Sequence, residues 1–231
     1  MTAKIIDDTN LRNRSFIFED RDDAGAYLAK AMEQYAEKDA MILAIPSGGV
    51  PIGLSISSYL HLPFDMLIIR KIPVPGNPEA GFGAMNLDGD MILNDRIVNM
   101  LGLSQEDIDE LAAPVRTELQ IRNNIFRAAK PPPQIKGKII ILADDGLASG
   151  YTMVAATRMV RRKEPKEIVI AAPTGSADAI KLLSKEADTI FCPNIRSGYS
   201  FAVADAYRNW YDLTKEDVLD ALMKRGLSSG D

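Results

Sequence analysis

The chain has 231 residues, of which 46% are hydrophobic, and a formal net charge of −5. This is enough apolar material for a sizeable core, while the acidic balance argues against a nucleic-acid-binding surface, which needs clustered lysine and arginine. No stretch approaches the roughly 20 apolar residues of a membrane span, and a lone cysteine, Cys192, excludes an intrachain disulfide, so we expect a protein of the reducing cytoplasm.

Short apolar runs alternate with helical patterns along the chain, which predicts an α/β fold with an open, mainly parallel sheet flanked by helices. We expect strands over 41–45, 65–70, 138–143, 167–172 and 189–191. We expect helices over 21–36, 51–60, 94–101, 104–129, 152–162, 177–185 and 214–224, the last capped by Thr214. Pro114 predicts a kink or a break in the helix over 104–129.

The segment 71–90 differs from the rest of the chain because it is rich in proline and glycine. It contains Pro73, Pro75, Gly76, Pro78, Gly81, Gly83 and Gly89. This composition excludes a regular helix, and we expect a long flexible loop of the kind that often serves as an active-site lid. A plain surface loop is the alternative. Glu79 is either an acid or base on this loop or an ordinary solvated carboxylate.

The segment 139–152 carries the most chemical information. An apolar run ends in Asp144 and Asp145, and ligands of open α/β sheets bind beyond the carboxyl ends of the strands. The two carboxylates can accept hydrogen bonds from sugar hydroxyls, with a metal ion nearby. The alternative is an ordinary strand-to-helix turn that happens to be acidic.

A loop of small residues follows the two acids and leads into the expected helix. The N-terminus of a helix favours a phosphate group, Ser149 and Thr152 add hydroxyl donors, and Gly150 allows a ligand to approach the backbone. We therefore predict that this one segment holds a ribose and its 5′-phosphate. The Gly-Lys-Ser/Thr pattern of nucleoside-triphosphatases is absent, so hydrolysis of that kind is not indicated.

This segment resembles the phosphoribosyl diphosphate (PRPP) motif of type I phosphoribosyltransferases, in which a strand ends in two acids and a small-Thr/Ser-Gly-x-Thr loop follows. The resemblance covers roughly residues 18–211. Within the family, the chain is similar to a bacterial and archaeal subgroup that has Gly-Asn-Pro-Glu in its loop. It implies one domain over 1–231, with a core over about 18–192 and a small C-terminal hood over about 193–231. Residues 71–90 would be the family's flexible catalytic loop.

The resemblance also implies an activity: a nitrogen nucleophile, such as a nucleobase or a related heterocycle, displaces diphosphate from PRPP. The residues that it places on PRPP are Asp144, Asp145, Ala148, Ser149, Gly150, Tyr151 and Thr152. Those on the diphosphate are Ser47, Gly48, Gly49, Arg70 and Lys71, and the catalytic candidates are Lys71 and Glu79. Mg²⁺ would lie near the two acids, through water, and a homodimer is implied because members of the family are commonly dimers.

Two positions depart from the pattern. Ser47 stands where the similar subgroup usually has arginine, which weakens the case for strong diphosphate binding. Ala148 stands where enzymes for 6-oxopurines carry an aspartate, which argues against hypoxanthine or guanine as the acceptor.

Two other functions remain as alternatives. A non-catalytic sensor of PRPP or a nucleotide on the same fold is slightly favoured by Ser47, although no DNA-binding module is visible. A phosphoacceptor receiver domain also uses acidic pairs, but there the acids close the first strand. His61, the single histidine, is interpreted as structural, and the aromatic residues near the C-terminus as core or interface: Tyr199, Phe201, Tyr207, Trp210 and Tyr211.

Overall fold

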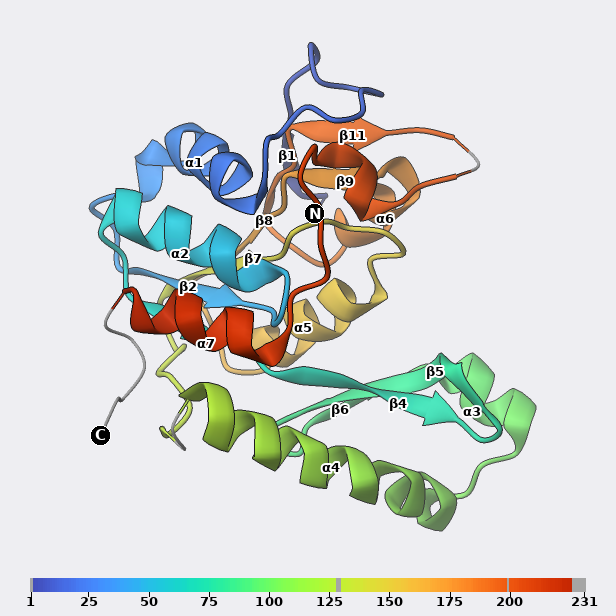
Figure 1. Cartoon of the computed structure of the whole chain (residues 1–231). Coiled ribbons are helices and arrows are strands. Elements are labelled where there is room, and N and C mark those ends of the chain that lie inside the picture. The colour runs from blue at the N-terminus through green and yellow to red at the C-terminus, as the bar shows by residue number, and fades with distance from the viewer. Residues whose placement is uncertain (1, 128–129, 199, 226–231) are drawn as a thin grey trace. The chain divides into compact units, whose positions relative to one another are not determined.

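The computed structural model describes residues 2–127, 130–198 and 200–225, and for residues 78–80 it describes the backbone alone. The chain forms two compact units (Figure 1). Unit 1 comprises Met1–Leu67 and Pro133–Asp231, and unit 2 comprises Ile68–Pro132. The single domain and the C-terminal hood inferred from the sequence stay predictions, and residues 193–225 belong to unit 1.

Unit 1 is built on a six-stranded sheet in which every pair of neighbouring strands is parallel. Its strands are β1 (Lys4–Ile6), β2 (Ala40–Ala44), β3 (Phe64–Met66), β7 (Ile139–Ala143), β8 (Glu167–Ala171) and β10 (Thr189–Phe191), in the order β1-β10-β8-β7-β2-β3. The central strands β7 and β8 are nearly all apolar and β-branched, as strands covered on both faces require. The predicted α/β class is confirmed, and of the six strands of this sheet the sequence did not predict the edge strand β1.

Helices cover both faces of this sheet. The helices of unit 1 in the described part of the chain are α1 (Arg21–Ala31), the short 3-10 helices η1 (Glu33–Tyr35) and η2 (Val203–Ala206), α2 (Gly49–Leu60), α5 (Tyr151–Arg161), α6 (Ala177–Leu183) and α7 (Lys215–Met223), of which α7 packs on α2. The chain leaves β2 for β3 and leaves β7 for β8 in opposite directions along the sheet. Because crossovers between parallel strands are right-handed, α2 and α5 lie on opposite faces. No helix in the described part of the chain is long and apolar enough to cross a membrane.

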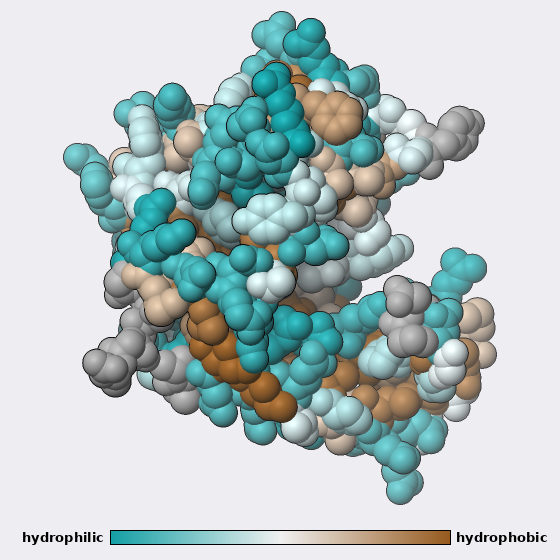
Figure 2. All heavy atoms as spheres, viewed as in Figure 1, coloured by the Kyte–Doolittle hydropathy of each residue, from teal (hydrophilic) through white to brown (hydrophobic). Residues whose placement is uncertain are grey.

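The hydrophobic core of unit 1 lies between the sheet and the pair α1 and α2. Alternate residues of β7, such as Ile139 and Ile141, face buried residues of the two helices, such as Leu28 and Ile52. A second, two-stranded parallel sheet, β9 (Thr174–Ser176) and β11 (Asn194–Arg196), follows the ends of β8 and β10. The outer surface in the view of Figure 2 is largely hydrophilic, as the charged composition predicts.

Unit 2 corrects the prediction of a flexible loop over 71–90. This segment belongs to a three-stranded antiparallel sheet of β4 (Ile69–Val74), β5 (Asn77–Asn86) and β6 (Met91–Leu93). The expected strand over 65–70 is accordingly divided between β3 and β4. The prolines and glycines mark turns and irregularities: Gly76 turns the chain between β4 and β5 at φ +74°, and Pro73 lies at a register shift opposite Gly81.

Two helices complete unit 2: α3 (Asp95–Leu101), whose N-terminus is capped by Asn94, and α4 (Gln105–Arg127). The break expected at Pro114 does not occur, since α4 is one uninterrupted helix of 23 residues (Figure 1). Buried residues on one side of α4, including Ile108, Ala112 and Leu119, pack this helix onto β4 and β5. We infer that this packing offsets the hydrogen bond that Pro114 removes.

Candidate phosphoribosyl site

The candidate site lies where two predicted segments come together at the carboxyl ends of adjacent strands. The turn 45–49 follows β2, and the loop 144–150 follows β7, which is the parallel neighbour of β2. The Ile45 amide donates to the Ala143 carbonyl at 2.9 Å, which joins the two segments. Because the chain leaves β2 and β7 in opposite directions, this is the topological switch point at which open α/β sheets bind ligands.

The turn after β2 approaches the acids so closely that two of its residues must be glycine. A Cβ atom on Gly48 would lie 2.0 Å from Oδ2 of Asp145, and one on Gly49 would lie 2.3 Å from the Ala143 carbonyl oxygen. Contacts this short do not occur between real atoms. The Gly48-Gly49 pair is therefore part of the same local structure as the acids, and its predicted contact with the diphosphate stays a prediction.

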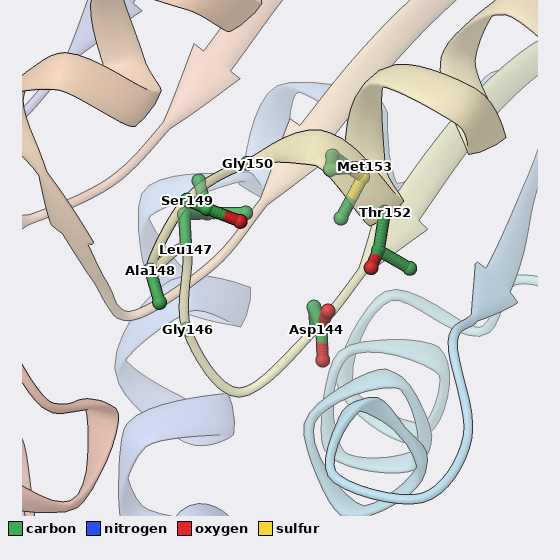
Figure 3. Close-up of a pocket in the computed structure, with 8 residues that line it drawn as sticks. All are labelled: Asp144, Gly146, Leu147, Ala148, Ser149, Gly150, Thr152 and Met153. Carbon is green, nitrogen blue, oxygen red and sulfur yellow. The ribbon is translucent and has the colours of Figure 1, made fainter. Parts of the chain in front are cut away.

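A small cavity opens beside the loop after β7. Its volume is about 140 Å³, and it is lined by Asp144, Gly146, Leu147, Ala148, Ser149, Gly150, Thr152 and Met153. In Figure 3 the loop curves around this space, with the Thr152 side chain close to the Asp144 carboxylate. Most of the residues predicted to bind PRPP therefore share one cavity, with Asp145 and Tyr151 as the exceptions.

Backbone contacts with β9 fix the loop. The Leu147 amide donates to the Thr174 carbonyl at 2.9 Å, and the Ser176 amide donates to the Leu147 carbonyl at 2.9 Å. The Ser176 hydroxyl donates to the Ala148 carbonyl at 2.7 Å. Gly150, at φ +79°, then turns the chain into α5, whose first N–H groups have no acceptor within the helix and are suited to an anion.

The two acids occupy different surroundings. Burial raises the pKa of Asp144 well above its ordinary value, and the neighbouring Asp145 carboxylate raises it further. Burial also raises the pKa of Asp145, but the Arg21 guanidinium, whose Nε donates to Oδ2 of Asp145 at 2.9 Å, opposes that shift. The Asp145 amide donates to Oδ1 of Asp144 at 2.9 Å.

Sequence reasoning did not find Arg21. It lies in the first turn of α1, its side chain is 8% exposed, and its guanidinium carbon is 3.9 Å from the centre of the Trp210 ring. The Tyr207 hydroxyl donates to the Asp145 carbonyl at 2.6 Å. No local pattern marks an arginine that meets its partner 124 residues later, although the interpretation of Tyr207 and Trp210 as packing residues is confirmed.

The comparisons with known proteins settle the family. The phosphoribosyl transferase domain matches residues 19–207. The chain belongs to the phosphoribosyltransferase family. It is 34% identical, over 203 residues, to two proteins of Mycobacterium tuberculosis, strains CDC 1551 / Oshkosh and H37Rv, named as candidate phosphoribosyl transferases. The match covers 88% of this chain and 46% of those proteins, so the chain spans about half their length.

A solved structure agrees with the family assignment. The protein TT1426 of Thermus thermophilus is 31% identical to this chain, with a TM-score of 0.76, and the match covers 90% of this chain and 98% of that one. The resemblance inferred from the sequence is therefore confirmed at the level of family and fold. The roles of individual residues stay predictions.

Other residues that the sequence placed at the site belong to unit 2 and are described within it. Nη2 of Arg70 forms an ion pair with Oε1 of Glu118 on α4 at 2.5 Å. The Lys71 side chain passes over Gly81, where a Cβ atom would lie 2.3 Å from Cγ of Lys71. The Glu79 side chain lies outside the described part of the structure, as does Tyr199.

His61 has a structural position, as predicted. It ends α2 as the C-cap residue, with φ +53° in the left-handed region, and its amide donates to the Ser57 carbonyl. Its side chain is exposed. In this position it ends a helix, and nothing in its surroundings assigns it to the site.

The residues present would fit a magnesium ion that arrives with its ligand. The described residues contain no group of three His, Cys, Asp or Glu side chains that could hold a metal by themselves. Asp144, however, faces the cavity with its carboxylate. Mg²⁺ is commonly held by one or two carboxylates together with substrate phosphates and water, and Asp144 could supply such a ligand.

Proposed function

We propose that this chain is an enzyme that transfers the phosphoribosyl group of PRPP to a nitrogen nucleophile, a nucleobase or related heterocycle, with release of diphosphate. The observation that carries the proposal is the convergence of Asp144, the loop 146–150 and Thr152 on one cavity, beside the Gly48-Gly49 turn. Family membership over residues 19–207 supports the same chemistry. The proposal includes the predicted Mg²⁺, cytoplasmic location and homodimer.

Each part of the site has a role in this proposal. Ser149, Gly150, Tyr151 and Thr152, at the start of α5, bind the 5′-phosphate through backbone N–H groups and hydroxyls. Asp144 accepts hydrogen bonds from the ribose hydroxyls. The phosphate anchors the substrate away from the reacting carbon, which is where binding energy best supports catalysis.

The leaving group determines the remaining roles. Bond breaking at C1 runs ahead of bond formation, so positive charge develops on the ribose as it does in glycoside cleavage. The diphosphate that departs carries negative charge, which a bound Mg²⁺ ion would neutralise. Lys71, with Arg70 and the Ser47–Gly49 turn, is proposed to hold the diphosphate, and Glu79 to act as acid or base.

A binding protein without catalysis is the second candidate, and two observations favour it. Ser47 supplies no positive charge where the similar subgroup usually has arginine. Arg70 is engaged in an ion pair with Glu118, so this predicted diphosphate contact has a competing partner. Such a protein would bind PRPP or a nucleotide and release no diphosphate.

A screen of acceptors distinguishes the two functions. The chain, PRPP and Mg²⁺ are incubated with a panel of nucleobases and related heterocycles, and diphosphate release is measured. Release that depends on one acceptor confirms the enzyme, and the Asp144→Asn variant is the matched negative control. Calorimetric binding of PRPP without release by any acceptor would favour the sensor. Failure of PRPP, ribose 5-phosphate and nucleoside 5′-monophosphates to bind would contradict both functions.

A further inference from the structure

Arg21 is a buried cation directly behind the candidate site. Its side chain is 8% exposed, and three groups surround its guanidinium. Nε donates to Asp145 at 2.9 Å, Nη1 donates to the Tyr211 carbonyl at 3.0 Å, and the guanidinium carbon lies 3.9 Å from the centre of the Trp210 ring. A buried charge is tolerated only when it is paired, so these contacts are what allow Arg21 to occupy this position.

These contacts constrain Asp145 on several sides. One oxygen of its carboxylate accepts from Arg21, and the Gly48 backbone lies against the same carboxylate. Its carbonyl oxygen accepts from the Tyr207 hydroxyl at 2.6 Å. Asp145 is not among the residues that line the cavity, whereas Asp144 is. The two acids of the motif are therefore not equivalent.

We propose that Arg21 is a positioning residue that holds Asp145 behind the loop and so leaves Asp144 as the acid that meets the ligand. The inference rests on the proposed function, since it assigns roles within the same site. Tyr207 and Trp210 belong to the same arrangement, because they hold the Asp145 backbone and the Arg21 guanidinium. The C-terminal segment up to Tyr211 thus shapes the site through Arg21.

The geometry requires arginine in particular. A planar guanidinium can donate in two directions in its plane and stack its face on an aromatic ring at the same time. A lysine ammonium is a single point charge and cannot reproduce all three contacts. Lysine at position 21 should therefore retain the ion pair with Asp145 but lose the stacking on Trp210 and the fixed orientation of the carboxylate.

The chain carries its own spectroscopic probe of this arrangement, because Trp210 is its single tryptophan. The test compares Asp144→Asn, Asp145→Asn, Arg21→Gln and Arg21→Lys with the wild type. The measurements are thermal unfolding, Trp210 fluorescence, and calorimetric affinity for PRPP with Mg²⁺. Arg208→Gln, which changes an exposed arginine of the same C-terminal segment, is the control and should alter none of the three.

The inference predicts a split between the variants. Asp144→Asn should weaken PRPP binding by about 10-fold or more, the loss of a charged hydrogen bond, with unfolding temperature and emission unchanged. Asp145→Asn and Arg21→Gln should each leave a buried partner unpaired, lower the unfolding temperature by about 10 °C and change the Trp210 emission. Arg21→Lys should recover much of the unfolding temperature while the emission and the affinity stay altered.

Opposite results would overturn the inference. If Asp145→Asn abolished PRPP binding while unfolding and emission stayed as in the wild type, Asp145 would be the ligand-facing acid. Where Arg21→Gln or Asp145→Asn does not fold, Tyr207→Phe provides a milder test, and unchanged affinity and emission in that variant would count against the arrangement. If the wild type did not bind PRPP, the proposed function would fail, and unfolding and emission of the Arg21 variants would still confirm or overturn the Arg21–Asp145 pairing.

Discussion

Gly48 illustrates how one backbone position serves the site. Its φ of −58° suits any residue, so alanine there would ordinarily be tolerated or slightly stabilising. The effect of the substitution is instead determined by a steric clash, because the added Cβ would lie 2.0 Å from the Asp145 carboxylate. We expect Gly48→Ala to weaken PRPP binding by about 10-fold, since one strained hydrogen bond or displaced charge is enough for that change. Calorimetric titration measures it, with exposed Ser58→Ala on the same helix as the control; unchanged affinity in Gly48→Ala would contradict the structure of this turn.

Tyr35 predicts a pH dependence of stability. Burial, and then its hydrogen bond to Glu167, raise the pKa of this phenol from 10.0 to about 12. The folded protein therefore keeps the proton to a higher pH than the unfolded chain does. The stability that Tyr35 contributes is complete below about pH 10 and is lost as the pH rises towards about 12.

Urea unfolding between pH 9 and pH 12 checks this expectation. Tyr35→Phe should show a shallower loss of unfolding free energy over that range than the wild type. The exposed Tyr59→Phe controls for the removal of a tyrosine elsewhere. Identical slopes for wild type and Tyr35→Phe would show that the buried hydrogen bond to Glu167 does not govern the titration.

At the scale of elements, the sequence predicted what periodicity and capping encode. The apolar strands over 139–143 and 167–171 and the helix capped by Thr214 were found because each carries its own local signal. The sheet of unit 2 was missed because turn and bulge residues such as Pro73, Gly76 and Gly81 look, in sequence, like the residues of an irregular loop. The Arg21–Asp145 contact was missed because it depends on tertiary packing alone.

The hairpin of β4 and β5 leads to a prediction about exchange. Paired backbone groups in this hairpin should protect its amides from hydrogen exchange even without ligand, and exchange should be fast at the turn around Gly76. Peptides covering 69–72 and 83–86 provide the measurement, with the turn as an internal control. Rapid exchange throughout both peptides in the free protein would contradict this expectation and support the flexible loop predicted from the sequence.

For the molecule as a whole, the residues proposed to bind the ligand are divided between the two units. The phosphate loop, the two acids and the Gly48-Gly49 turn all belong to unit 1, while the proposed diphosphate contacts Arg70 and Lys71 belong to unit 2. A ligand that stops at the ribose should therefore stabilise unit 1 alone. A ligand that carries the diphosphate should stabilise both, because a group bound only to the folded form stabilises whatever it contacts.

The experiment compares ribose 5-phosphate with PRPP, each with Mg²⁺ and each at the same multiple of its own Kd. Trp210 fluorescence follows the unfolding of unit 1, which contains the single tryptophan, and hydrogen exchange in β4 and α4 follows the opening of unit 2. At 100 times Kd, each ligand should stabilise unit 1 by about 2.7 kcal/mol. PRPP alone should slow exchange in unit 2, and Lys71→Ala should remove that added protection without changing the response to ribose 5-phosphate. Equal exchange in unit 2 with both ligands would show that Arg70 and Lys71 do not contact the diphosphate and that the whole site belongs to unit 1.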